Sequence, residues 1–192
     1  MTTLGEMFGT FTRSAWRLEG RDTYRVAGEE ERIAAFLRGE PLPRKTRENN
    51  GWIATVEDAG ARGAWIGRVR LVGHPITDYT RFEFAAYPDN VAAGEDVQVL
   101  DRVALDPSWS GVPDFWLFDD ETVFVQHYDD EGHFLGAEQA HDVAPFLEAR
   151  RRLAGHTVPV SKFQLTDIPK QRPGMVLGPP PALLLVSATV KR

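Results

Sequence analysis

The chain has 192 residues, of which 42% are apolar and 26% are charged, with no cysteine and a formal net charge of -6. This length predicts one domain with a tail, and the balance of apolar and charged residues excludes a wholly disordered chain. The lack of cysteine excludes disulfides, thiol nucleophiles and thiolate metal sites, and the acidic balance opposes broad binding to a phosphate backbone. The N-terminus has no basic and then apolar signal, and the longest apolar run, 182–186, is far below the roughly 20 residues of a membrane-spanning helix. We therefore expect a cytoplasmic protein that neither enters a membrane nor contacts nucleic acid directly.

The first third of the chain predicts a helical lead-in, a hairpin and two helices. Apolar residues recur at helical spacing over residues 4–11, and apolar and charged residues alternate over 16–19 and again at 24–26, which predicts a short hairpin. Residues 29–38 begin with acids, carry an apolar stripe and precede Gly39 and Pro41, as a helix does. Residues 52–61 predict a second, amphipathic helix that glycines close.

The middle of the chain predicts an α/β layer. Residues 65–72 alternate Arg68 and Arg70 with apolar neighbours, which predicts a strand, and residues 95–100 predict another. Between them lies an unusually aromatic helix, capped by Thr77 or Asp78, which Pro88 should end or kink near Tyr87. A last helix is expected over residues 142–153, with Asp142 as its cap.

The stretch from Asp114 to Glu138 predicts a three-stranded antiparallel meander. Three short aromatic and β-branched runs are separated by two acidic turns, 119–120 and 129–132. If the first turn has two residues, Trp116 and Phe118 share a face with Val123 and Val125, and the opposite face carries Phe115, Leu117 and Phe124. Both faces are apolar, so the meander should lie at the centre of the fold with helices above and below.

These elements together predict an α+β protein with one mixed, largely antiparallel sheet that helices cover on both faces. We place the domain at residues 1–158 and a Pro-rich tail at 159–192, because six of the thirteen prolines lie in the last 34 residues. Residues 182–190 of the tail have strand character without charge or proline. This strand should either add to a sheet edge, in the same chain or in a partner, or remain a frayed end.

Two clusters of basic residues can be interpreted either as solvated side chains or as binding sites. Arg44, Lys45 and Arg47 lie in a polar loop, and residues 150–152 are three arginines in the last turn of the final helix. Solvated side chains explain the loop, and the helix dipole favours cations at the end of the helix. Binding to an anion remains the alternative for both clusters.

Histidines and carboxylates of the meander are the candidate catalytic residues. His127 and His133 are expected on opposite faces of their hairpin, which weakens a joint metal site, and we predict no metal. One histidine with a turn acid could still act as a general base, and the candidates are His127, Asp119, Asp120 and Asp129. The alternative is that they are a rim histidine and solvated turn acids.

Common catalytic motifs do not occur in the chain. It has no P-loop, GxGxxG, GxSxG or HExxH motif, and its serines lie in no nucleophile motif. No cofactor is indicated. A Ser/His/Asp triad is not tested by one sequence, because its members meet only in the folded chain.

The order of helix, strand, aromatic helix and strand before the FWLFDD meander resembles the core of phospholipase D-like domains. Those enzymes use an H-x-K motif, and no histidine of this chain is followed by lysine at that spacing. If the fold is the same, the resemblance implies a pocket that binds without that catalytic apparatus.

A closer resemblance covers residues 11–158. The strings PITDYTRFEFAAYPDNVAAGEDVQVL and DFWLFDDETVFVQHYDDEGHFLGAE are similar to an actinobacterial family of uncharacterised domains that is often encoded beside helix-turn-helix transcription regulators. That resemblance implies a regulatory setting with a protein partner or a small ligand, and it supplies no catalytic residues.

Two functions follow as hypotheses. The first is a non-enzymatic binding or regulatory module that acts with a DNA-binding transcription regulator and senses a small molecule. Its expected ligand-binding residues are Trp109, Trp116, Tyr79 and Arg81, and its expected partners are the regulator or a second copy bound through residues 182–190. The alternative is a hydrolase or phosphoesterase with a site built from His127 and the turn acids.

Overall fold

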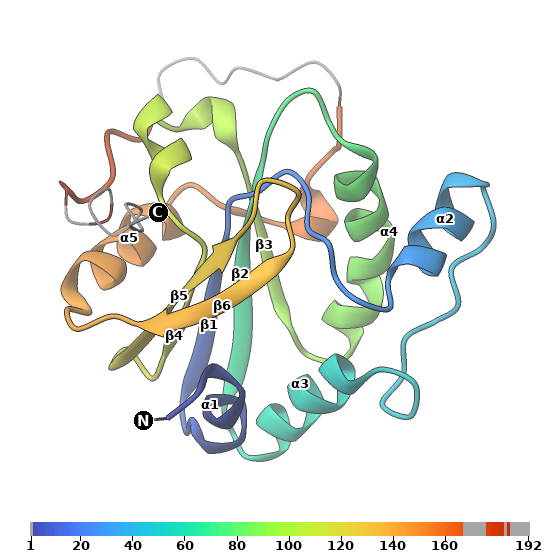
Figure 1. Ribbon diagram of the computed structural model, residues 1–192, viewed down its shortest axis with the longest axis horizontal. Helices are drawn as coiled ribbons and strands as arrows, with labels where there is room; N and C mark the ends of the chain where they lie inside the picture. Colours follow the sequence, from blue (N-terminus) through green and yellow to red (C-terminus); the bar gives the residue numbers. More distant parts are fainter. Residues whose placement is uncertain (1, 167–175, 183, 185–192) are drawn as a thin grey trace.

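A single sheet of seven strands runs through the residues that the computed structural model describes, which are 2–166, 176–182 and 184 (Figure 1). The strand order is β6-β5-β4-β1-β2-β3-β7. The strands are β1 (Ser14–Glu19), β2 (Trp65–Val72), β3 (Asp96–Asp101), β4 (Phe115–Phe118), β5 (Thr122–Tyr128), β6 (Phe134–Gln139) and β7 (Val158–Pro159). The pairs β1–β2 and β2–β3 are parallel, and the other four pairs are antiparallel.

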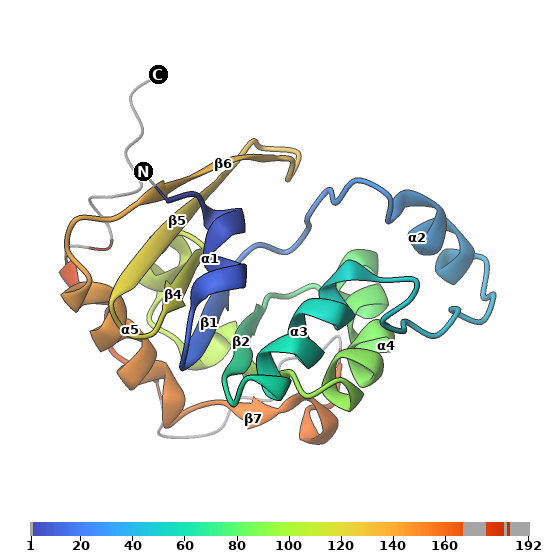
Figure 2. The same ribbon diagram turned by 90° about the horizontal axis from the view of Figure 1, so that it is seen from below.

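Helices cover both faces of this sheet, so the predicted α+β class is confirmed (Figure 2). The helices are α1 (Leu4–Thr10), α2 (Glu30–Leu37), α3 (Gly51–Ala61), α4 (Asp78–Ala92) and α5 (Ala144–Ala154). Phe146, Ala149 and Leu153 of α5 pack on one face, and Val56 and Ala59 of α3 pack on the other. None of the helices in the described part of the chain has the length and apolar character needed to cross a bilayer.

The predicted N-terminal hairpin is wrong. Residues 14–19 form β1, which pairs in parallel with β2 and antiparallel with β4. Tyr24 lies outside the named strands, and Arg25 forms an isolated bridge with His133. The alternating pattern was correct for β1, but the pattern does not say which strand is its neighbour.

The predicted meander exists as β4, β5 and β6, but two of its details are wrong. Its first turn has three residues, because Phe118 pairs with Thr122, and this moves the register by one residue from the predicted two-residue turn. Leu117 therefore lies opposite Val123, and Trp116 lies opposite Phe124. The meander also forms one half of the sheet, with β6 at the edge, while β1 is the central strand.

The aromatic helix α4 passes through Pro88 and continues to Ala92, so of the two predicted outcomes, an end or a kink near Tyr87, the end is wrong. Thr77 caps the helix by accepting a hydrogen bond from the N–H of Thr80. The continuation matters for the cavity described below, because it keeps Asn90 on the same helix as Glu83.

Described parts of the predicted tail contact the rest of the chain. β7 pairs with β3, and Leu177 bridges to Leu105. The indole N–H of Trp109 donates to the carbonyl of Gly178, and Leu184 is buried in the core beneath α5. Most of the predicted strand 182–190 lies outside the described residues.

Candidate functional site

Charged side chains of the two central parallel strands meet on one face of the sheet. Because β1 and β2 pair in register, Arg17 lies beside Arg68 and Glu19 lies beside Arg70. Glu19 bridges the strands: its carboxylate is 2.7 Å from Arg17 Nη1 and 3.1 Å from Arg68 Nη1. Residues at alternate positions of a strand share a face, so these four side chains point the same way while Leu18 and Val69 enter the opposite core.

Two further carboxylates complete this buried charge cluster. Arg68 Nη2 is 2.5 Å from Glu95 Oε1, and Arg70 Nη2 is 2.8 Å from Glu83 Oε2. Arg70 is fully buried at 0% exposure, and Glu19 is 2% exposed. Buried charges of this kind persist only when they are paired, since an isolated ion in a protein interior is very costly.

Aromatic rings surround the guanidinium groups. The guanidinium carbon of Arg17 lies 5.6 Å from the ring centres of both Tyr24 and Trp116. That of Arg68 lies 5.7 Å from the rings of Trp52 and Tyr87. Such stacking stabilises a desolvated cation and fixes its orientation.

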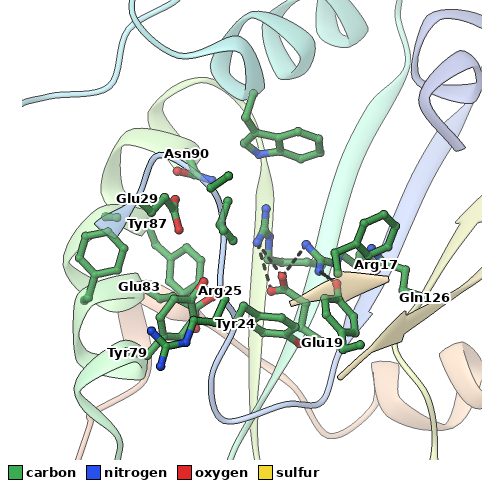
Figure 3. A pocket seen from close by; sticks show the side chains of 18 of the residues that line it. Arg17, Glu19, Tyr24, Arg25, Glu29, Tyr79, Glu83, Tyr87, Asn90 and Gln126 are labelled. Atoms are coloured by element: carbon green, nitrogen blue, oxygen red, sulfur yellow. Dashed lines mark hydrogen bonds and ion pairs between the residues drawn. The ribbon is translucent and has the colours of Figure 1, made fainter. Parts of the chain in front are cut away.

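A cavity of about 630 Å³ opens over this cluster (Figure 3). Its floor comes from Arg17, Glu19 and Arg68, and Gln126 of β5 also borders it. One wall is a face of α4, whose lining residues recur at helical spacing: Tyr79, Phe82, Glu83, Ala86, Tyr87 and Asn90. The N-terminal helix and the loop before α2 also contribute lining residues, so the cavity is bordered by segments far apart in the sequence (Figure 3).

Several residues that line the cavity have a buried polar atom with no hydrogen-bond partner among the described residues. These atoms are Glu83 Oε2, Tyr87 Oη, Asn90 Oδ1, Gln126 Oε1 and Arg17 Nε. Glu83 Oε2 is close to Arg70, but the pair is not aligned as a hydrogen bond. Unpaired buried polar atoms are rare in native proteins, because each one costs roughly 1–3 kcal/mol.

The two carboxylates nearest the floor have pKa values shifted in opposite directions. Burial opposes the charged form of Glu19, but the three guanidinium groups around it lower its pKa to about 2. Burial raises the pKa of Glu83 to about 7, because Arg70 only partly offsets the loss of solvent. Nearer the loops, burial raises the pKa of Glu29 and lowers the pKa of Lys45, and each of these groups partly offsets the shift of the other. Carboxylates with raised pKa values in a cavity are typical of binding and catalytic sites.

Two of the predicted ligand-binding residues line the cavity, and two do not. Tyr79 and Trp116 are lining residues. Trp109 is buried in the core on the α5 side of the sheet. Arg81 is half-buried on α4 but does not border the cavity.

The predicted catalytic candidates are not brought together. Asp119 accepts hydrogen bonds from the backbone N–H groups of residues 12–14, and Asp120 pairs with Arg150, both at the β4–β5 turn. Asp129 lies beyond the other end of β5, with its carboxylate 2.9 Å from Nδ1 of His133. His127 is 3.7 Å from Glu138 on β6. None of the four candidates lines the cavity.

The basic clusters mostly have acidic partners. Arg47 is 2.7 Å from Asp58, and Arg151 and Arg152 both contact Glu148. Lys45 is the member that lines the cavity. Within residues 2–166, 176–182 and 184, no three histidine, aspartate or glutamate side chains gather in a way that could hold a metal ion.

Sequence reasoning missed the charged floor and Glu83. In an alternating strand, Arg17, Arg68 and Arg70 look like solvent-facing residues, and only the parallel pairing beneath α4 buries Arg68 and Arg70 and partly covers Arg17. One feature of the sequence could have indicated the site: Glu83 and Asn90 fall on the same helical face as the aromatic residues of α4. Polar residues inside an apolar helical stripe often mark a site.

Comparison with known proteins adds a family but no activity. No curated protein matches the chain. The setting beside transcription regulators and the likeness to phospholipase D-like domains stay predictions. One family model, described as a domain of unknown function (DUF6879), matches residues 2–165. The chain therefore belongs to the DUF6879 family of domains of unknown function.

Proposed function

We propose that this protein is a non-enzymatic binding and regulatory module that holds a small molecule in the cavity between the central strands and α4. One observation carries the proposal: five of the residues that border an aromatic-walled cavity of about 630 Å³ each have a buried polar atom without a hydrogen-bond partner, four oxygens and one nitrogen in all. Ligand cavities are typically about 300–1,000 Å³ and combine apolar walls with a few oriented polar groups. A bound molecule would satisfy these atoms.

A purely structural role for the charge cluster explains less. The ion pairs of Arg68 with Glu19 and Glu95 join β2 to β1 and to the residue before β3, and the pair of Arg70 and Glu83 joins β2 to α4, without any need for a cavity. They do not account for the open atoms of Tyr87, Asn90 and Gln126, which a structural cluster would pair. The open atoms therefore favour a ligand over a structural role alone.

The regulatory part of the proposal rests on the resemblance described for residues 11–158 and on charge. A net charge of -6 opposes direct contact with DNA, so the module would act through a DNA-binding transcription regulator. The expected result is that a helix-turn-helix regulator, if one is encoded beside this protein, copurifies with it, and that a cavity ligand changes the amount recovered. If the regulator neither copurifies with this protein nor changes its thermal stability, the proposed regulatory role is wrong. That result would not affect the proposal of ligand binding.

Ligand binding itself is tested with a small-fragment library and two matched alanine variants. Ala86 lines the cavity on α4, and its neighbour Ala85 is exposed on the same helix. We expect Ala86→Phe to fill part of the cavity and abolish fragment binding, as measured by protein NMR shifts, while Ala85→Phe leaves binding unchanged. A library with no hit on the unchanged protein would refute the proposal.

A catalytic role is a second candidate, which one observation favours. Glu83 has a pKa of about 7 in a cavity, as a general acid or base requires near neutral pH. If Glu83 transfers protons, bound molecules should be converted, and Glu83→Gln should stop conversion more strongly than it weakens binding. Recovery of every bound molecule unchanged, by mass spectrometry, would favour the binding module.

A further inference from the structure

The open hydrogen-bonding atoms of the residues that line the cavity are mainly acceptors. Asn90 Oδ1 and Gln126 Oε1 can only accept, Glu83 Oε2 accepts when the carboxyl is ionised, and the Tyr87 hydroxyl can accept or donate. All four residues are more than nine-tenths buried, and three of them lie on α4. Arg17 Nε is the one open donor among these atoms. A ligand that satisfies the cavity must therefore bring donors.

The cations of the cavity floor are already occupied by the protein itself. Arg68 contacts both Glu19 and Glu95, and Arg17 contacts Glu19 and donates to the hydroxyl of Tyr128. An anionic ligand would have to compete with these contacts for the same guanidinium groups. Two further cations line the cavity, but Arg25 is exposed, and burial lowers the pKa of Lys45, a shift that the nearby carboxylate of Glu29 only partly offsets.

Carboxylates and electron-rich rings lie together on the α4 side. Glu83 and Tyr87 are one helical turn apart, so their side chains neighbour each other. Tyr79 and Phe82 line the same wall, and within the described residues no guanidinium stacks on either ring. These two rings pack on each other and on Tyr24 and Phe36. Glu29 supplies a second, half-buried carboxylate from the loop before α2. A carboxylate beside such a cluster of aromatic rings is an arrangement that suits an organic cation.

We propose that the ligand is a small molecule with a protonated amine on an aromatic or apolar body, and that the amine donates to Glu83 and Tyr87. This inference rests on the proposed ligand-binding function and specifies its ligand class. Asn90 and Gln126 accept from further donor groups of the ligand, and the rings of Tyr79 and Phe82 contact its body.

Binding of an amine at this place is linked to proton release. Arg70 and Arg68 of β2 and Arg17 and Glu19 of β1 act on the Glu83 carboxylate, yet burial holds its pKa at about 7. A bound ammonium group stabilises the ionised carboxylate, so Glu83 gives up its proton when the amine binds at neutral pH. Amine affinity therefore rises between about pH 6 and pH 8, a range in which an alkylamine itself stays protonated.

Three probes that share one body test the proposal on the unmodified protein: 2-phenylethylamine, 2-phenylethanol and 3-phenylpropionate. We expect the amine to bind about tenfold more tightly than the alcohol, and the carboxylate to bind most weakly, because charged hydrogen bonds are the stronger ones. Calorimetry in two buffers of different ionisation enthalpy should show proton release for the amine. Equal or tighter binding of the carboxylate would overturn the amine proposal and leave ligand binding intact. If no probe and no library fragment binds, the proposed function itself fails.

Two variants locate the amine. Glu83→Gln should weaken amine binding about tenfold and remove the proton release. The control is Glu31→Gln, an exposed glutamate on α2 outside the cavity, which should change nothing. Because Glu83→Gln leaves the fully buried Arg70 without a carboxylate and can unfold the chain, Tyr87→Phe serves as the second variant, with an expected loss of about fivefold. Amine affinity that Tyr87→Phe leaves unchanged, or that a folded Glu83→Gln leaves unchanged, would overturn the proposal.

Discussion

Glu19 and Glu83 show how position within one charge cluster decides the charge of a side chain. Both carboxylates are buried on the same side of the sheet. Glu19 has hydrogen bonds from Arg68 and an ion pair with Arg17, whereas Glu83 has one guanidinium that is not aligned to donate to it. Burial opposes the charge of both groups, but the guanidinium groups around Glu19 lower its pKa to about 2, whereas Arg70 only partly offsets the burial that raises the pKa of Glu83 to about 7.

These shifts predict how stability depends on pH. The pKa of Glu83 rises from 4.5 to about 7 on folding, so its contribution to stability is full below pH 4.5 and is lost as pH rises through 7. The pKa of Glu19 falls from 4.5 to about 2, so its contribution is present above pH 4.5 and is lost as pH falls through 2. We expect urea unfolding of the unmodified protein to give a free energy on the order of 1–3 kcal/mol lower at pH 8 than at pH 5. The Glu83→Gln variant should lose most of this difference and the Glu31→Gln control should keep it; an equal difference in all three proteins would assign it to other groups.

Asp119, a predicted catalytic candidate, holds the start of β1 against the β4–β5 turn. Its carboxylate accepts from the backbone N–H groups of Thr12, Arg13 and Ser14 at 2.7–2.8 Å. Although partial burial opposes ionisation, these donors lower the pKa of Asp119. Asp119 and Asp120 both have positive φ angles, 54° and 61°, so they carry similar backbone strain and differ in their contacts.

We therefore expect Asp119→Ala to destabilise the protein by about 2 kcal/mol, because several charge-assisted hydrogen bonds are lost at a partly exposed site. Asp120→Ala is the matched control. It removes a partly exposed ion pair to Arg150 and should cost less than about 1 kcal/mol. Chemical denaturation of both variants measures the difference, and equal losses would show that backbone strain at the turn outweighs the Asp119 contacts.

At the level of elements, turn length decided the register of the meander. A third turn residue, Glu121, shifts β5 by one position relative to β4. Val123 and Val125 consequently face the α5 core, and Phe124 joins Trp116 on the other face. Both arrangements bury apolar side chains, so the apolar pattern could not choose between them.

Pro88 in α4 has a cost that a substitution can reveal. Proline has no N–H, so the carbonyl four residues earlier, at Phe84, loses its helical hydrogen bond. Since Pro88 is exposed, Pro88→Ala should stabilise the protein by about 1 kcal/mol, less than the full cost of an interior proline because proline also restricts the unfolded chain. The control is Pro107→Ala, an exposed proline at the first position of a 3-10 turn (Pro107–Gly111), where no gain is expected. Thermal unfolding compares the two, and a lower melting temperature for Pro88→Ala would show that the proline geometry is needed in α4.

At the level of the whole molecule, the residues after the family match contribute to the core. The family model ends at residue 165, yet Leu177 exchanges backbone hydrogen bonds with Ala104 and Asp106, and Leu184 is buried beneath α5. The indole of Trp109 depends on Gly178 for its hydrogen-bond acceptor.

Truncation after Thr166 should therefore destabilise the domain by roughly 2–4 kcal/mol. The loss comes from one buried leucine and four hydrogen bonds, including one from Arg152 to the carbonyl of Pro179, and the entropy of ordering the segment offsets part of it. Leu184→Ala should account for about 2 kcal/mol of this loss. Val176→Ala, at a side chain that is 67% exposed, is the control and should change little. A truncated protein as stable as the full chain would show that the segment does not pack this way in solution.

The sequence alone determined the α+β class, helices close to 30–37, 51–61 and 144–154, and the strands of the meander, because local apolar periodicity and capping residues specify these elements. It did not determine the site. The Arg17-x-Glu19 and Arg68-x-Arg70 patterns are the same whether a strand faces water or another layer, and only parallel pairing in the middle of the sheet brings them together under α4. Tertiary structure also decided the charge of Glu83, since its pKa depends on burial and on Arg70, which comes from a different element. The catalytic candidates were chosen for residue type, and β5 keeps Asp119 and Asp129 apart at its two ends, a separation that the strand predicted between the two turns already implied.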